Sequence, residues 1–413
     1  MRLSGLTALA STPRSRPSGA AAGVGRPAAP LRGLTSLRFF AAAMIVIGHG
    51  AGEFGFQLGA DALFALNTGV SFFFVLSGFI LYYNYPVLPD RAAVGHFYLA
   101  RFARIWPLHF FAFVLVLIVY PSAAWVQPGI VRWLAALLSV SLLQAWFPLI
   151  GGYTSAFNGP AWTLSVEVFF YLLFPWLLPR VLEAPLRTLV GVLLLSLACS
   201  VVANAVGGPR SDLPLDQWNW YLLDHSFPLS RLAEFALGMA SARWWTGRRQ
   251  PGAGNAALGT MLELEAIALL VAGLAYVHRV PELGLWLGSG TGDWLAQVAL
   301  APLYALLIVS VASGRGWISS WLGRPLLVRL GELSYAVYLL HIAVLASISW
   351  PALTASWHAP AAILVFALVL LGVAYLAWCY IESPARAFIL RRGRDRGGRE
   401  RRAPAPRQSA GWR

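Results

Sequence analysis

The chain has 413 residues, of which 58% are hydrophobic and only 12% are charged. Soluble domains carry about 25% charged and about 45–50% apolar residues, so this composition excludes an ordinary soluble domain and indicates a membrane protein. All 31 basic residues are arginine, which gives a formal net charge of +14 and excludes a Schiff-base lysine, a pyridoxal phosphate enzyme and a P-loop lysine.

Two polar tails are predicted at the ends of the chain. Residues 1–32 are rich in Ala, Pro, Arg, Ser and Gly, a composition typical of a disordered segment. Residues 391–413 are predicted to form a second, basic disordered tail. The membrane domain is therefore expected to occupy residues 33–386.

Between the tails lie ten apolar stretches, each long enough to cross about 30 Å of hydrocarbon as a helix that rises about 1.5 Å per residue. They are 34–50, 64–84, 106–121, 162–179, 186–206, 229–246, 257–276, 294–313, 333–352 and 360–381. An eleventh apolar stretch covers 131–150. The predicted fold class is all-α, a polytopic transmembrane bundle of about ten spanning helices.

The positions of the arginines predict the topology, because cytoplasmic loops collect basic residues. Arg26 and Arg32 precede the first span and a basic tail follows the last one, so both termini are predicted to be cytoplasmic. With this topology residues 122 and 161 both lie on the external side of the membrane. The stretch 131–150 between them therefore cannot cross the membrane a single time. We predict that this stretch is re-entrant or interfacial; the alternative is that one loop breaks the charge rule.

The first span carries two ionisable residues, Arg38 and His49, and such residues in a membrane helix are often functional. They are eleven residues apart, about three helical turns, so they share one face at about 16 Å along the axis. A neutral imidazole can accept a hydroxyl proton near pH 7, which suits His49 as a general base. The structural alternatives are a snorkelling interfacial cation for Arg38 and an interhelical hydrogen bond for His49.

Two arginines and one glutamate begin the third and fourth spans. Arg101 and Arg104 are three residues apart on one helical face, an arrangement that suits phosphate groups but is also ordinary positive-inside anchoring. Glu167 shares a face with Tyr171, four residues on. Its carboxylate is expected to orient a histidine or bind an acceptor hydroxyl; the structural alternative is an ion pair with a neighbouring helix.

Two other polar groups are predicted to be structural. Arg231 and Glu234 are three residues apart on one helix and are expected to pair with each other. Ser334, Tyr338 and His341 lie on one face of a later helix. A polar packing seam is the favoured interpretation of these three side chains, rather than a second catalytic site.

Seven short stretches occur in a fixed order along the membrane part. They are Leu34–Arg38 leading to His49, Gly69–Phe79, Arg101–Pro107, Trp162–Glu167, Arg231–Phe235, Leu330–Tyr335 leading to His341, and Ile381–Arg386. Together they resemble the acyltransferase-3 family of bacterial membrane O-acyltransferases, which modify O-antigens, exopolysaccharides, peptidoglycan and some antibiotics. The resemblance extends from about Leu34 to Arg386.

The resemblance implies specific roles for the ionisable residues. Arg38 and His49 match a motif in which ten residues separate an arginine from a histidine. The histidine of this motif is essential for transfer. Arg101 and Arg104 match an Arg-x-x-Arg motif tied to the acyl donor, and Glu167 matches the first acidic position of a later segment.

The chain departs from the family pattern at two positions. The residue after this glutamate is Val168, where many members carry a second acid, and Ser71 stands where many members carry aspartate. A role that needs a carboxylate pair is therefore not expected.

The expected function is transfer of an acyl group, with acetyl as the expected group, from acyl-CoA to a hydroxyl of a cell-envelope saccharide or related acceptor. The enzyme is expected in the bacterial cytoplasmic (inner) membrane. The catalytic residues are His49 and Glu167, the donor-binding residues are Arg38, Arg101 and Arg104, and the supporting residues are Ser165, Tyr171, Glu234, Tyr338 and His341. His49 acts either as a general base or as an acylated intermediate.

No bound cofactor, metal or nucleic acid is expected, since Cys199 and Cys379 lie in apolar segments and no base-stacking module accompanies the arginines. The alternative function is a transporter or flippase of a lipid-linked saccharide. Transporters commonly show an internal repeat, and we see none in the sequence.

Overall fold

Helices make up the regular structure of the protein in this computed structural model, which describes residues 30–119, 130–147, 154, 156–206, 221–248, 255–287 and 289–402. Nine helices of the described ranges are long and apolar enough to cross a membrane, and these ranges contain no strand. The predicted all-α polytopic bundle is therefore confirmed. The unit that contains the bundle begins at Leu31.

The main helices follow the predicted spans in chain order. They are α1 (Arg32–Gly50), α3 (Gly69–Asn84), α4 (Arg91–Val119), α8 (Trp162–Glu183), α9 (Pro185–Val206), α11 (Leu232–Arg248), α12 (Ala256–Tyr276), α15 (Ala301–Ser313), α17 (Pro325–Ser347), α19 (Ala359–Ala377) and α20 (Ser383–Arg402). Shorter helices are α2 (Ala60–Asn67), α6 (Ile130–Val140), α10 (Tyr221–His225), α13 (Gly284–Leu287), α14 (Ser289–Val298), α16 (Trp317–Leu322) and α18 (Trp350–Trp357).

Several boundaries differ from those expected. The span predicted over 64–84 consists of α2 and α3, which meet at Thr68. The helix α4 already begins at Arg91, well before residue 106, where the third span was predicted to begin. At the other end α20 continues past Arg391, where the basic tail was expected to begin. The predicted N-terminal tail lies outside the described residues, apart from its last few.

The apolar stretch 131–150 contains the helix α6, which has 11 residues. A helix of this length covers only about 16 Å, so it cannot cross a membrane alone. This agrees with the expectation that the stretch does not cross once. Residues 148–150 lie outside the described residues.

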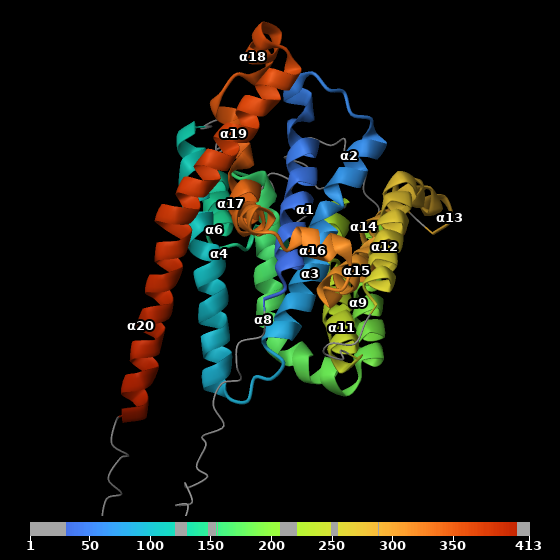
Figure 1. Cartoon of the computed structure of the whole chain (residues 1–413), viewed down its shortest axis with the longest axis vertical. Helices are drawn as coiled ribbons and strands as arrows, with labels where there is room; N and C mark the ends of the chain where they lie inside the picture. The colour runs from blue at the N-terminus through green and yellow to red at the C-terminus, as the bar shows by residue number, and fades with distance from the viewer. Residues whose placement is uncertain are drawn as a thin grey trace, which may run out of the picture. The chain divides into compact units, whose positions relative to one another are not determined.

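The centre of the bundle is formed by α1, which packs along α17 and contacts α3 (Figure 1). The helix α20 lies beside α4 at one edge, and α12 lies at the opposite edge of this view (Figure 1). A π-helical turn, Trp378–Glu382, joins α19 to α20 and ends on a buried carboxylate. Such turns are frequent at functional sites.

The helices α3 and α11 approach each other closely through two glycines. A Cβ atom at Gly238 would collide with the carbonyl oxygen of Val75, and one at Gly78 would collide with that of Phe235. Small residues at a crossing let two membrane helices pack backbone to backbone. The glycines therefore fix the distance between these two helices.

The substitution Gly238→Ala is expected to destabilise the protein by about 1–3 kcal/mol, because the added methyl group meets backbone that cannot move aside. The matched control is Gly191→Ala in α9, where a Cβ atom would have nothing within 4 Å. The thermal midpoints of the two detergent-solubilised variants provide the measurement. An equal midpoint in both would contradict the close-packing argument.

Asp224 in the short helix α10 is 1% exposed, and its Oδ1 atom has no hydrogen-bond partner. Burial and the neighbouring charge of Asp293 raise the pKa of Asp224 from 3.8 to about 7. A raised carboxyl pKa means that the folded protein binds more protons than the unfolded chain. Stability is therefore expected to fall as the pH rises from about 4 to about 7.

The substitution Asp224→Asn removes this titration. We expect the variant to gain on the order of 2 kcal/mol over the parent protein at pH 8 and little at pH 4, because asparagine resembles the protonated carboxyl group. Thermal midpoints of both proteins at the two pH values measure the difference. A gain that does not depend on pH would contradict the assignment.

Candidate active site

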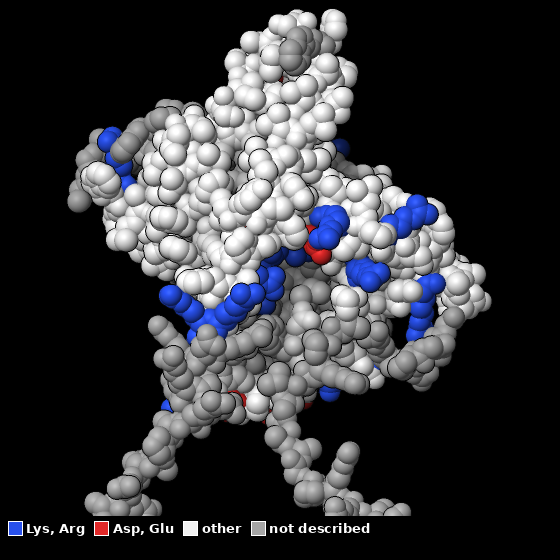
Figure 2. All heavy atoms as spheres, turned by 60° about the vertical axis from the view of Figure 1, so that its left-hand side comes forward, with Lys and Arg blue, Asp and Glu red and all other residues white. Residues whose placement is uncertain are grey.

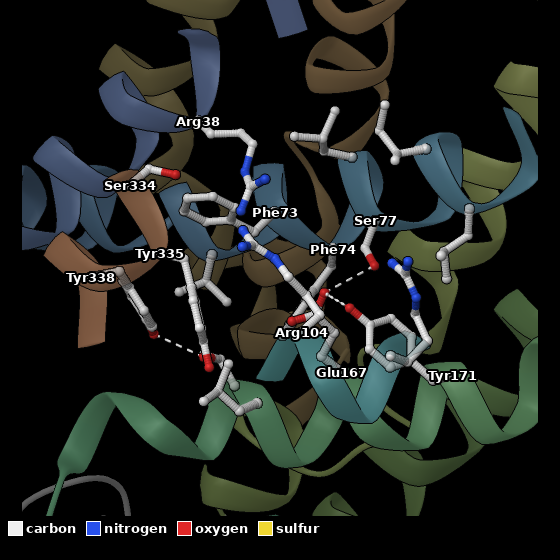
Figure 3. Close-up of a pocket in the computed structure, with 17 residues that line it drawn as sticks. Arg38, Phe73, Phe74, Ser77, Arg104, Glu167, Tyr171, Ser334, Tyr335 and Tyr338 are labelled. Carbon is white, nitrogen blue, oxygen red and sulfur yellow. Dashed lines mark hydrogen bonds between the residues drawn. The ribbon is translucent and has the colours of Figure 1, made fainter. Parts of the chain in front are cut away.

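A cavity of about 140 Å³ lies among α1, α3, α4, α8 and α17. Its polar lining comprises Arg38, Ser77, Arg101, Arg104, Thr163, Glu167, Tyr171, Ser334, Tyr335 and Tyr338. Figure 3 shows the guanidinium groups of Arg38 and Arg104 meeting in the cavity, with Glu167 beside Arg104. The three arginines and the glutamate that the sequence singled out therefore line one cavity.

The arginines of the cavity are held by specific partners. Arg104 forms an ion pair with Glu382, at the end of the π-helical turn, and its guanidinium lies 5.1 Å from the ring centroid of Tyr335. Arg101 donates to the hydroxyl of Tyr85 over 3.2 Å, and its Nε atom is buried without a hydrogen-bond partner. This orphaned donor points to a ligand with acceptor oxygens.

Arg38 projects from α1 toward the charges of the other helices. It lies close enough to Arg104, Glu167 and Glu382 to interact electrostatically with each of them. Three arginines face two carboxylates around the cavity, which leaves a net charge of +1 if all are ionised. Arg38 is thus an interior cation rather than a snorkelling one.

Glu167 lies on α8 at the junction of the cavity with α3. Its Oε1 atom accepts hydrogen bonds from the hydroxyl of Ser77 over 3.3 Å and from that of Tyr171 over 2.5 Å (Figure 3). The predicted shared face of Glu167 and Tyr171 is confirmed. The carboxylate holds these two hydroxyl groups rather than a histidine.

His49 lies outside the lining of this cavity, in the last turn of α1. Its side chain is exposed, and its Nδ1 atom is 2.8 Å from Nε2 of His341 on α17. The planes of the two imidazole rings are 8° from parallel and their centroids are 5.1 Å apart, as expected for rings that meet edge to edge through this hydrogen bond. The interhelical hydrogen bond considered for His49 therefore exists, and its partner is His341.

Tyr338 connects the cavity to this histidine pair. Its side chain lines the cavity, and its hydroxyl lies 2.9 Å from that of Thr163. Its carbonyl oxygen is 2.5 Å from Nδ1 of His341. Ser334, nearer the N-terminus of α17, also lines the cavity. The expected packing seam of Ser334, Tyr338 and His341 therefore reaches the cavity at one end and His49 at the other.

Close packing of α1 against α17 brings these groups together. A Cβ atom at Gly331 would collide with the carbonyl oxygen of Thr35, so the two backbones are in direct contact near their N-terminal ends. The histidine pair lies toward their C-terminal ends. The two helices are therefore parallel neighbours along most of their length.

The remaining predicted residues lie away from the cavity lining. Arg231 pairs with Glu234 at 2.7 Å, and both side chains are buried, so the expected pairing is confirmed. Ser71, at the position where many family members carry an acid, accepts a hydrogen bond from Arg231 over 3.0 Å. Ser165 is buried, and its hydroxyl oxygen is 3.4 Å from the backbone nitrogen of Ala145.

Sequence reasoning assigned no role to the last stretch of the motif series. Glu382 provides the partner of Arg104, and Arg386 lies close enough to Arg101 and Arg104 for their charges to interact.

Figure 2 shows arginine side chains gathered around a hollow on the face turned forward. The only available signal was the position of Glu382 and Arg386 in the closing stretch Ile381–Arg386, far along the chain from the paired arginines.

Comparison with known proteins identifies similar sequences over most of the chain. A family profile described as an acyltransferase domain matches residues 31–380. The chain is 31% identical to acyltransferase MdmB of Streptomyces mycarofaciens over 76% of this chain and 79% of that protein. It is 29% identical to exopolysaccharide production protein ExoZ of Rhizobium meliloti over 80% of this chain and 91% of that protein.

A third relative is nodulation protein 10 of Rhizobium leguminosarum bv. viciae. It is 25% identical over 84% of this chain and 91% of that protein. No solved structure matches the chain.

Proposed function

This chain belongs to the acyltransferase-3 family of membrane acyltransferases, and on that premise we propose that it moves an acyl group from acyl-CoA to a hydroxyl of a saccharide. The observation that carries the proposal is the convergence of Arg38, Arg101 and Arg104 in one cavity, with His49 on the same helix as Arg38. Acetyl-CoA is the proposed donor.

The arginine-lined cavity is the proposed docking site for the phosphates of the donor. Guanidinium groups bind phosphate oxygens through paired, charge-assisted hydrogen bonds. Arg101 offers the buried Nε–H without a partner, and Arg386 adds a further cation nearby. The arginine positions predict this end of the cavity to be cytoplasmic, where acyl-CoA is available.

His49 is the proposed base for the transfer. The unprotonated ring nitrogen takes the proton of the acceptor hydroxyl while the hydroxyl oxygen attacks the thioester carbonyl carbon. The carbon–sulfur bond then breaks, and the CoA thiolate leaves and takes the proton from His49, so that the ester and free CoA are the products. If His49 attacks first, the same atoms pass through an acyl-imidazole.

The geometry suits entry of the two substrates from opposite sides. Arg38 and His49 are about 16 Å apart along α1, so a donor anchored at the arginines must extend toward the C-terminal end of this helix. The exposed ring of His49 is open to an acceptor that approaches from the predicted external side. A buried path for the thioester would also exclude water, which otherwise hydrolyses it.

The acceptor and the location complete the proposal. One relative is an exopolysaccharide production protein, which supports a cell-envelope saccharide as the acceptor class. We propose the bacterial cytoplasmic membrane as the location, with both termini in the cytoplasm, because arginines flank the first and last spans.

Radiolabelled acetyl-CoA and candidate saccharides, added to the purified protein in lipid nanodiscs, test the proposal. Label is expected to appear on the saccharide and to be released by mild alkali, as for an ester. Comparison of envelope glycan masses from a deletion strain and its parent identifies the acyl group as the lost mass. Transport of a saccharide into vesicles without any labelling would instead support a transporter.

A further inference from the structure

His341 lies between His49 and a backbone carbonyl group and contacts both through its ring nitrogens. These two contacts determine which nitrogen of each imidazole carries a proton. We infer that His341 is a positioning residue, which holds His49 as the tautomer with its proton on Nδ1 and a free electron pair on Nε2. The inference rests on the proposed role of His49 in acyl transfer. It assigns a function to a side chain that the sequence pattern favoured as packing.

The proton of His341 is placed by Tyr338. The Nδ1 atom of His341 is 2.5 Å from the carbonyl oxygen of Tyr338. A carbonyl oxygen only accepts hydrogen bonds, and it has two lone pairs, so it can serve a side chain as well as the helix. The Nδ1 atom of His341 must therefore be the donor and carry a proton.

The second nitrogen of His341 is then an acceptor. This side chain is 0% exposed, and a charged imidazolium in such a place would be costly to bury without a carboxylate. A neutral imidazole carries one proton, which is already on Nδ1. The Nε2 atom of His341 is therefore bare and accepts a hydrogen bond.

His49 must supply that hydrogen bond. Its Nδ1 atom lies 2.8 Å from the bare Nε2 atom of His341, so it carries the proton of the neutral ring. The Nε2 atom of His49 is left with a free electron pair, as a base or a nucleophile requires. If Nε2 takes the hydroxyl proton, Nδ1 keeps its own, and the same hydrogen bond persists in the imidazolium.

The pairing also orients the ring. His49 lies on an exposed face at the end of its helix, where its side chain would otherwise rotate freely. The nearly parallel, hydrogen-bonded arrangement with a fully buried partner holds the imidazole plane in place. His341 thus provides both the tautomer and the direction of the reactive nitrogen.

Two variants of His341 separate this role from packing. In His341→Leu the side chain cannot accept a hydrogen bond, and kcat is expected to fall about 10²-fold while KM for acetyl-CoA changes less than about twofold. In His341→Gln the amide oxygen takes the place of Nε2 and accepts from His49. This variant is expected to recover at least about a tenth of the parental kcat.

The matched control is His109→Leu. His109 is also buried, at 1% exposed, and one of its ring nitrogens lies 2.9 Å from the carbonyl oxygen of Ser139. His109 lies on α4 but is not part of the cavity lining, so its replacement removes a buried imidazole without touching the proposed site. Its kcat is expected to stay within about twofold of the parent. A loss equal to that of His341→Leu would overturn the inference, because the effect would then be general.

The glutamine variant provides the decisive outcome. If His341→Gln is as inactive as His341→Leu while both retain parental helical content, or if His341→Leu is fully active, the inference is wrong. The nitrogen-15 chemical shifts of the labelled parent protein, assigned by comparison with His49→Ala, give a second measurement that needs no folded variant at position 341. A protonated Nε2 in neutral His49 would overturn the inference.

Failure of the proposed function has a different signature. If His49→Ala transfers acetyl groups at the parental rate, His49 is not the base, and the proposed mechanism fails whatever the tautomer is. If His49→Ala is inactive but both His341 variants are fully active, only the positioning role fails.

Discussion

Replacement of His49 with alanine is expected to lower the rate of acyl transfer by at least about 10³-fold while the protein remains folded and inserted. The loss follows because the proposed acceptor of the hydroxyl proton is the imidazole of His49 in the last turn of α1. The measurement is transfer from labelled acetyl-CoA by the purified variant, with thermal stability recorded in parallel.

Removal of the exposed side chain of His49 costs little packing, so the stability loss should be limited to one broken hydrogen bond. The buried Nε2 atom of His341 loses its hydrogen-bond donor, which costs about 1–3 kcal/mol. The matched control is His96→Ala, another exposed histidine on the amphipathic start of α4, which should keep parental activity. Full activity of His49→Ala would contradict the proposed role of His49 in acyl transfer.

Replacement of Arg104 with methionine is expected to have two separable effects. The first is a rise of about 10–100-fold in KM for acetyl-CoA, because a charge-assisted hydrogen bond to phosphate contributes about 1.5–3 kcal/mol. The second is a loss of about 3–5 kcal/mol in stability, because Glu382 is left as a buried charge without its partner. Glu382 is 2% exposed, and its Oε2 atom already has no hydrogen-bond partner.

A double variant separates the two effects. In Arg104→Met with Glu382→Gln the unpaired charge is gone, so most of the stability should return, but KM should remain high. Michaelis curves for acetyl-CoA and thermal midpoints are measured on both variants. If KM returns to the parental value together with stability, Arg104 acts only through the fold. A change confined to the saccharide acceptor would equally contradict donor binding.

The sequence was sufficient for the fold class and for the four charged residues of the cavity lining, Arg38, Arg101, Arg104 and Glu167. Length and hydropathy predicted the membrane helices, since a spanning helix must bury its backbone hydrogen bonds within one apolar stretch. Helical spacing placed Arg101 and Arg104 on one face, and Glu167 and Tyr171 on another. These are local relations, and all four side chains line the same cavity.

Contacts between distant helices were not predictable in the same way. His49 and His341 are 292 residues apart in the chain, and Arg104 and Glu382 are 278 apart. No periodicity in one sequence says which helices are neighbours. The polar face of α17 was therefore interpreted as packing, although the same three residues connect the cavity to His49.

Helix ends were the other source of error. The apolar part of α4 begins near Trp106, but polar residues continue the helix back to Arg91, because an amphipathic helix can extend beyond the hydrocarbon. Hydropathy detects only the buried length. The paired arginines consequently lie well inside α4, and not at its start as predicted.

The parallel contact of α1 with α17 has a consequence for the choice of substrate. Both helices are rigid rods locked together at Gly331 and Thr35, and one of them carries Arg38 and His49 at a fixed axial separation of about 16 Å. Arg38 and His49 are therefore held at a fixed distance from each other. Under the proposed mechanism, a donor would need its thioester about that far from its phosphates, so the carrier would be selected by its length and not by the size of the acyl group.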